Sequence, residues 1–229
     1  MLAFDRNSNG IIEKNTTLEA GRMNYKNNIL YKSHKKIKEK ISMHKKALLW
    51  KLHGRPVPAP HAVKQMIQKH YAAKFKPLIF IETGTYMGEM IDAVLNDFPK
   101  IISIEYDPKL AVRAKEKYAA MDHVTILQGD SGKLLPELLL KIQEPCQFWL
   151  DAHYSGGVTG HAAEETPIVK EIKAILNHPC SEHVILIDDA REFTGNSNYP
   201  TLEELHRIIQ ENRKEWQMSV EADIIRIHK

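Results

Sequence analysis

Residues 77–95, PLIFIETGTYMGEMIDAVL, decide the fold. An apolar run of strand length, Leu78 to Ile81, ends in the loop Glu82-Thr83-Gly84-Thr85-Tyr86-Met87-Gly88, and a helical pattern follows from Glu89 to Asp97. Glycines at 84 and 88 stand where a backbone has to turn sharply and approach a ligand closely. The stretch therefore predicts a strand, a loop and a helix, with a nucleotide-type binding site at the end of the strand.

The same alternation continues along the chain. Strands are predicted at Leu78–Glu82, Ile101–Glu105, Val124–Leu127, Phe148–Asp151 and Val184–Asp188, and helices at His61–Phe75, Glu89–Asp97, Lys109–Met121, Lys133–Ile142, Glu165–Asn177 and Thr201–Arg213. Such alternation predicts an α/β, Rossmann-like, doubly wound and mostly parallel sheet with helices on both faces. Residues Met218–Val220 and Asp223–Ile227 are expected to close the sheet as an antiparallel C-terminal strand pair.

Length and composition favour a cytoplasmic protein with one main core. The 229 residues, 43% of them hydrophobic, suffice for one sizeable core. Two cysteines, Cys146 and Cys180, make no disulfide framework and show no metal-ligand spacing, which fits a reducing compartment. The apolar runs are far shorter than the roughly 20 residues that a membrane-spanning helix needs.

Charge is distributed unevenly between the two ends of the chain. The first 76 residues hold 17 Lys and Arg against 4 Asp and Glu, and the other 153 hold 15 against 25. We therefore expect a basic arm before an acidic body. Residues 1–24 are predicted to be a disordered segment or extension, residues 25–60 a basic helix with a Pro-rich linker, and residues 61–229 the main domain.

The basic arm carries an apolar stripe. Leu30, Ile37, Ile41, Leu48 and Leu52 recur at helical spacing with lysines between them. The lysines of residues 25–52 can lie on a membrane surface of anionic lipid, contact nucleic acid, or remain solvated. The sequence leaves these three interpretations open.

The acids at the first strand ends indicate the kind of ligand. The glycine spacing departs from the dinucleotide fingerprint G-x-G-x-x-G, and Glu82 in front of Gly84 suits a cationic ligand better than a pyrophosphate. Glu105 closes the second strand, where an acidic side chain can bind both hydroxyls of a ribose. Asp130 and Ser131 follow the third strand, where they can contact an adenine edge.

A second group of acids follows the fourth and fifth strands. Asp151 closes the segment FWLD, and Asp188 and Asp189 close ILIDD. Parallel strands bring such residues to one carboxyl edge, where ligands of open α/β sheets bind. Three adjacent carboxylates repel one another, and a hard divalent ion such as Mg²⁺ relieves that repulsion.

These motifs together resemble the class I S-adenosylmethionine-dependent methyltransferases over roughly residues 55–229. The resemblance implies that Glu82 holds the amino group of the methionine moiety, Gly84 and Gly88 shape the loop, Glu105 binds the ribose, and Asp130 with Ser131 flanks the adenine. The same cofactor site is expected to include Thr83, Thr85, Tyr86, Tyr106 and Asp151.

Tyr86 lies at the centre of the glycine motif. With a tyrosine at this position, the motif resembles that of the metal-dependent O-methyltransferases typified by catechol O-methyltransferase. That likeness implies a Mg²⁺ site at Asp151, Asp188 and Asp189. Those enzymes carry a lysine base after the first aspartate, whereas this chain reads Asp151-Ala152-His153-Tyr154. His153, with an ordinary pKa near 6.5, is therefore the candidate catalytic base beside Asp151.

The expected activity is Mg²⁺-assisted O-methylation of a small-molecule or sugar hydroxyl. The sugar acceptor comes from a further resemblance to small bacterial proteins encoded with surface-polysaccharide or natural-product genes. Two alternatives remain open: a nucleic-acid methyltransferase that uses the basic arm, and a non-catalytic adenosine-ligand-binding module tethered by it. Self-association into a homo-oligomer is a further expectation.

Overall fold

A computed structural model describes residues 34, 37–38, 41–151, 166–196 and 199–229. Its contacts divide the chain into two compact units, Met1–Leu52 and His53–Lys229. In the first unit the described residues form a helix over residues 41–52. The apolar stripe predicted there is exposed at Ile37, Ile41, Leu48 and Leu52. Leu30 and residues 1–24 lie outside the described part.

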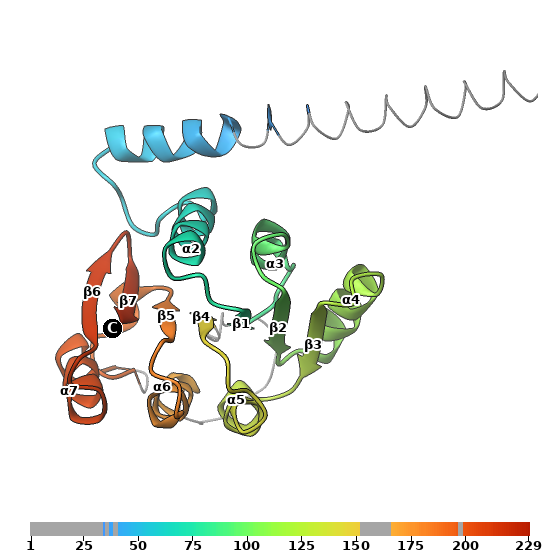
Figure 1. Ribbon diagram of the computed structural model, residues 1–229. Helices are drawn as coiled ribbons and strands as arrows, with labels where there is room; N and C mark the ends of the chain where they lie inside the picture. Colours follow the sequence, from blue (N-terminus) through green and yellow to red (C-terminus); the bar gives the residue numbers. More distant parts are fainter. Residues whose placement is uncertain (1–33, 35–36, 39–40, 152–165, 197–198) are drawn as a thin grey trace, which may run out of the picture. The chain divides into compact units, whose positions relative to one another are not determined.

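The second unit is built on a sheet of seven strands in the order β3-β2-β1-β4-β5-β7-β6 (Figure 1). The strands are β1 (Ile79–Thr83), β2 (Lys100–Glu105), β3 (Val124–Gln128), β4 (Cys146–Leu150), β5 (Val184–Ile187), β6 (Gln217–Glu221) and β7 (Ile224–His228). The first five pair in parallel, and β7 pairs antiparallel with both β5 and β6. The predicted fold class is confirmed, and the strand ends differ from the predicted ones by one or two residues.

Helices cover both faces of the sheet in two layers. They are α2 (His61–Phe75), α3 (Glu89–Val94), α4 (Pro108–Tyr118), α5 (Ser131–Leu139), α6 (Ile168–Asn177) and α7 (Leu202–Asn212), with the short 3-10 helix η1 at Ala190–Glu192. Figure 1 shows α2, α3 and α4 on one side of the sheet and α5, α6 and α7 on the other. Each layer buries its own apolar cluster against the strands.

The central strands are apolar on both faces because both faces are covered by helices. In β4, Phe148 packs in the cluster of α5, α6 and α7, and Trp149 in the cluster of α2, α3 and α4. Both side chains are buried. The acidic residues of these strands lie at their carboxyl ends, with Glu82 in β1 and Glu105 in β2.

Side-chain caps fix where two of the helices begin beside the strand ends. The carboxylate of Asp107 accepts hydrogen bonds from the backbone N–H groups of Lys109 and Leu110 at the start of α4. Asp130 accepts one from Gly132 at the start of α5. Such caps satisfy backbone donors that the first helical turn leaves unpaired. Among the described residues, no helix is long and apolar enough to cross a membrane.

Candidate active site at the carboxyl edge of the sheet

Strand register brings the predicted acids to one edge of the sheet. Glu82 near the end of β1 is level with Ser103 in β2 and Trp149 in β4. Beyond β4, the backbone N–H of Asp151 donates to the carbonyl of Thr83 at 3.1 Å. Glu105 ends β2, the other neighbour of β1. Glu82, Glu105 and Asp151, which are far apart in the sequence, thus share one edge of adjacent strands, as the alternating pattern predicted.

The loop after β1 adopts left-handed backbone conformations at three positions. Gly84 has φ of 87°, Tyr86 of 46° and Gly88 of 73°. At Gly88 a Cβ atom would overlap the side chain of Tyr118 in α4, whose hydroxyl donates to the Gly88 carbonyl at 2.7 Å. Position 88 therefore requires glycine for two reasons, its left-handed backbone conformation and the close approach of the Tyr118 side chain.

Glu82 is a buried carboxylate with an uncharged partner. The hydroxyl of Ser103 donates to Glu82 Oε2 at 2.6 Å, and a further hydroxyl contact joins Ser103 to Thr85. Burial raises the pKa of Glu82 to about 8, because desolvation outweighs the hydrogen bond from Ser103 and because the nearby acids, Asp151 first among them, add repulsion. A ligand with a positive charge would remove this penalty.

Glu105 joins two loops through its two carboxylate oxygens. Oε2 accepts a hydrogen bond from the backbone N–H of Tyr86 at 2.8 Å, and Oε1 accepts one from that of Asp107 at 2.9 Å. The side chains of Tyr86 and Tyr106 are exposed, whereas Glu105 is buried. Glu105 therefore holds the glycine loop against the loop after β2, in addition to any ligand it binds.

Asp130 and Ser131 lie beside this loop pair. The backbone N–H of Gly129 donates to the carbonyl of Glu105 at 2.9 Å, which aligns the end of β3 with that of β2. Asp130 caps α5, and Ser131 is buried at its first turn. The Glu171 carboxyl from α6 is fully buried near Ser131, and burial raises its pKa to about 7.

A second acidic group lies at the ends of β4 and β5. Asp151, Asp188 and Asp189 each offer a carboxylate oxygen within 4.8 Å of the others. Burial raises the pKa of Asp188 to about 7, and repulsion by Asp151 adds to the effect, while Lys64 opposes it. The structure therefore brings together all three carboxylates predicted to hold a metal ion.

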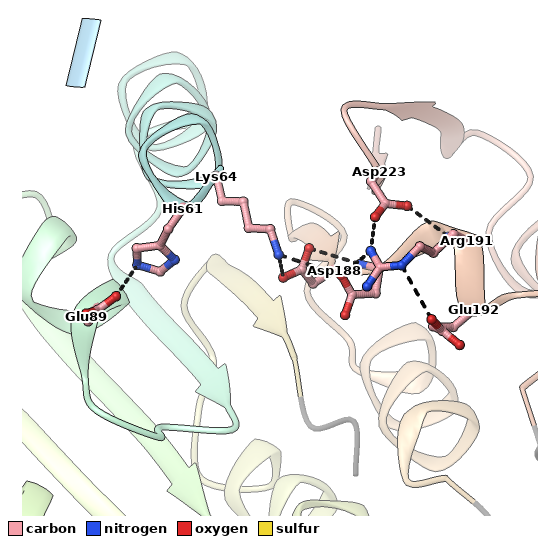
Figure 2. A network of polar contacts seen from close by, with 8 residues as sticks. His61, Lys64, Glu89, Asp188, Arg191, Glu192 and Asp223 are labelled. Atoms are coloured by element: carbon pink, nitrogen blue, oxygen red, sulfur yellow. Dashed lines mark hydrogen bonds and ion pairs between the residues drawn. The ribbon is translucent and has the colours of Figure 1, made fainter. Parts of the chain in front are cut away.

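Two basic side chains enter this acidic group from opposite sides (Figure 2). Lys64 in α2 forms an ion pair with Asp188, and its Nζ lies 3.7 Å from Asp189 Oδ1. Arg191 in η1 donates to Asp189 Oδ1 at 2.7 Å and also pairs with Asp223, from the turn between β6 and β7. Arg191 thus neutralises acids of this edge.

Sequence analysis missed three residues that shape the site: Lys64, Ser103 and Asp223. Lys64 had a detectable signal, since it lies four residues before the fully buried Gln68, on a stripe of α2 that continues to Tyr71. Ser103 lies in the middle of an apolar strand, where one small polar residue is an ordinary occurrence. Asp223 lies in a hairpin turn, where aspartate is common for conformational reasons, so its presence gave no sign of a role in the site.

The candidate base His153, with Tyr154 after it, lies outside the described residues. His61 at the start of α2 is the described histidine near the edge. It lies 3.4 Å from Glu89, and burial lowers its pKa, an effect that Glu89 opposes. A recess beside the acidic group is lined by Leu150, Asp151, Thr166, Ile168, Glu171, Ile187, Asp188 and Tyr199.

Solved structures resemble this chain closely enough to define its fold. A methyltransferase of Podospora anserina bound to SAH superimposes with a TM-score of 0.53 and 18% identity, covering 80% of this chain and 86% of that one. The O-methyltransferase TomG of Streptomyces achromogenes, involved in tomaymycin synthesis and solved with SAM, gives 0.55 and 16%, covering 81% and 87%. An O-methyltransferase of Bacillus cereus with SAH gives 0.56 and 12%, covering 82% and 90%.

The fold is that of the S-adenosylmethionine-dependent O-methyltransferases. The resemblance inferred from the glycine motif and the acidic strand ends is confirmed at this level. No family model and no curated protein sequence matches the chain.

Proposed function

We propose that this protein is an S-adenosylmethionine-dependent methyltransferase that methylates a hydroxyl group of a small molecule or sugar with the help of Mg²⁺. The observation that carries the proposal is the placement of Glu82 and Glu105 beside the glycine loop, with the aspartates of β4 and β5 at the same edge. Both halves lie on a fold whose solved relatives hold SAM or SAH.

The first half has the chemistry to bind a sulfonium nucleoside. Glu82 is buried in a negative environment, which favours an ammonium or sulfonium group. Glu105 is positioned for ribose hydroxyls at the end of β2, and Asp130 with Ser131 flanks the place for the adenine. Thr83, Thr85, Tyr86, Tyr106 and Asp151 complete the proposed cofactor site, with Gly84 and Gly88 shaping its loop.

The second half of the site, at the ends of β4 and β5, offers the oxygen ligands that a hard divalent ion requires. Asp151, Asp188 and Asp189 supply carboxylate oxygens, the ligand type that Mg²⁺ prefers, within a span of 4.8 Å. A bound Mg²⁺ supplies Lewis-acid chemistry, which lowers the pKa of a hydroxyl acceptor. The three aspartates would hold the ion.

The chain's own contribution to methyl transfer is mainly orientation. Displacement at a sulfonium methyl is an in-line reaction that needs little covalent help from the protein, so holding two reactants in line supplies much of the rate. The hydrogen bond from Asp151 N–H to Thr83 fixes the spacing between the cofactor strand and the first aspartate. His153 is the proposed proton acceptor for the hydroxyl group.

Calorimetry tests the proposal directly. SAH and S-adenosylmethionine are titrated into the full chain with and without Mg²⁺, and then into Glu82→Ala and the matched control Glu89→Ala, an exposed acid at the start of α3. We expect saturable binding that is lost in Glu82→Ala and retained in the control. No saturable heat with the unaltered chain would contradict the methyltransferase assignment and favour a non-catalytic module.

The basic arm motivates the alternative acceptor. If residues 25–52 deliver nucleic acid to the site, RNA binding has to weaken steeply with salt and disappear when the arm is deleted. Vesicles of anionic lipid in the same assay distinguish a membrane-surface role. We favour the small-molecule acceptor because the body that carries the site is acidic, which opposes a polyanion.

A further inference from the structure

The ammonium group of Lys64 contacts two of the three proposed metal ligands, Asp188 and Asp189. It comes from α2, on the other side of the acidic group from Arg191, and forms an ion pair with Asp188 (Figure 2). The side chain of Lys64 is only 14% exposed, and those of Asp188 and Asp189 are 2% and 7% exposed. A buried lysine in contact with a buried carboxylate is strongly held, because removing either partner leaves an uncompensated charge.

The position of the ammonium group conflicts with a divalent ion. Oxygen ligands of Mg²⁺ lie about 2.1 Å from the ion, and an ammonium group that hydrogen-bonds to the same oxygens competes for that space. Two cations at such a distance also repel each other in a site with little water. The lysine stem has four rotatable methylene groups, which allow its head to withdraw without moving α2.

We propose that Lys64 is the resident cation at Asp188 in the Asp151, Asp188 and Asp189 cluster, whose Asp189 is also paired with Arg191, and that a divalent ion binds to the cluster only by displacing the Lys64 ammonium group. Lys64 is then a positioning residue with two roles. It stabilises the acidic cluster when the metal is absent, and it sets the metal concentration at which the site fills. This inference rests on the metal part of the proposed function.

Metal affinity provides the first test. Mn²⁺, a paramagnetic probe for a Mg²⁺ site, is titrated into the unaltered chain, Lys64→Met and Lys69→Met. Lys69 is the matched control, because it lies in the same helix and does not belong to the cluster. Its Nζ pairs with Asp97 Oδ2 at 2.6 Å. We expect Lys64→Met to bind Mn²⁺ about tenfold more tightly or better, and Lys69→Met to bind like the unaltered chain. Equal or weaker binding by Lys64→Met overturns the inference.

The stability of the protein in EDTA, measured by denaturant unfolding, provides a second test that requires no bound metal. In EDTA, Lys64→Met should unfold at a lower denaturant concentration than the unaltered chain, and Mn²⁺ should remove this difference, because the ion replaces the lost charge. In an Asp188→Asn background the same lysine substitution should cost much less, since the partner is already gone. No loss of stability in EDTA, or the same loss in both backgrounds, overturns the inference. If Lys64→Met is unfolded in EDTA, Lys64→Gln takes its place.

The outcomes separate this inference from the proposed function. If the unaltered chain binds Mn²⁺ and Lys64→Met binds it no better, the displacement fails and the metal site remains. If neither protein binds Mn²⁺, displacement and the metal part of the proposed function fail together. SAH titrated into the same samples decides the methyltransferase part by itself.

Discussion

At the ends of β1 and β2, the buried carboxylates of Glu82 and Glu105 accept hydrogen bonds from uncharged donors, the hydroxyl of Ser103 and two backbone N–H groups. At the ends of β4 and β5, Asp188 and Asp189 are paired with charged side chains. Uncharged donors do not neutralise these acids, so Glu82, whose pKa burial raises to about 8, can take up a cationic ligand by releasing its proton. Asp188 and Asp189 already face a lysine and an arginine, so a cation that binds there has to replace another cation.

The largest expected effect is a loss of ligand affinity that distinguishes the β1–β2 half of the edge from the β4–β5 half. Glu105→Ala removes the proposed acceptor of the ribose hydroxyls, and a hydrogen bond to a charged group contributes about 1.5–3 kcal/mol. It also releases the glycine loop from the loop after β2, because Glu105 binds a backbone N–H group of each. We expect SAH affinity to fall by about 100-fold or more, with Mn²⁺ binding retained. Asp188→Asn should show the reverse pattern. Loss of both ligands in either variant, measured by calorimetry, would show that the halves do not act separately.

Gly88→Ala sharpens the account of the first half. The added Cβ meets the Tyr118 side chain, and φ of 73° disfavours alanine. Gly54→Ala is the matched control, because φ is 81° there and a Cβ has no neighbour within 4 Å. We expect denaturant unfolding to show a loss of about 2–4 kcal/mol at 88 and about 1 kcal/mol at 54. Equal losses would mean that the contact with Tyr118 is unimportant.

The pH dependence of cofactor binding tests the charge of Glu82. Its pKa of about 8 means that the free protein carries Glu82 mostly protonated at pH 6, so binding an ammonium group there has to release a proton. We expect SAH affinity to rise by about tenfold per unit between pH 5.5 and 7.5. Buffers of different ionisation heat report the released proton. Glu82→Gln should bind weakly and without this slope, and an unchanged slope would exclude Glu82 as its source.

The smallest effect concerns Glu171, whose pKa is raised to about 7 from 4.5 by burial. A carboxyl with a raised folded-state pKa favours folding at low pH, and this contribution is lost as the pH rises from about 4.5 through 7. Glu171→Gln should therefore be more stable than the unaltered chain at pH 8, by on the order of 1 kcal/mol, and the difference should shrink toward pH 5. Parallel stability profiles in urea would contradict this assignment.

The sequence predicted the fold well because both of its signals are local. Apolar runs such as Val184 to Ile187 and the intervening helical patterns are readable within ten residues, and a parallel sheet then places every strand end at one edge. That rule alone brought Glu82, Glu105 and Asp151 together. The glycine loop added the expectation of a nucleotide-type binding site.

The partners of these acids were harder to predict, because each comes from an element packed across the sheet edge. Lys64 reaches Asp188 only through the way α2 lies on the sheet, and Asp223 reaches Arg191 only through the antiparallel hairpin. Sequence periodicity predicts which face of a helix is buried, but it does not predict which residues pack against that face. The role of His153 stays a prediction, since it lies outside the described residues.

The position of β7 has a consequence for synthesis of the chain. β7 follows β6 in the sequence but lies between β5 and β6 in the sheet, so it supplies the partner for both. Until β7 has left the ribosome, β5 therefore has an unpaired edge, and Arg191 lacks Asp223 until the turn before β7 has emerged. The nascent protein can assemble the nucleoside half of its edge first, and the contacts of Arg191 in the other half are completed only when the hairpin closes.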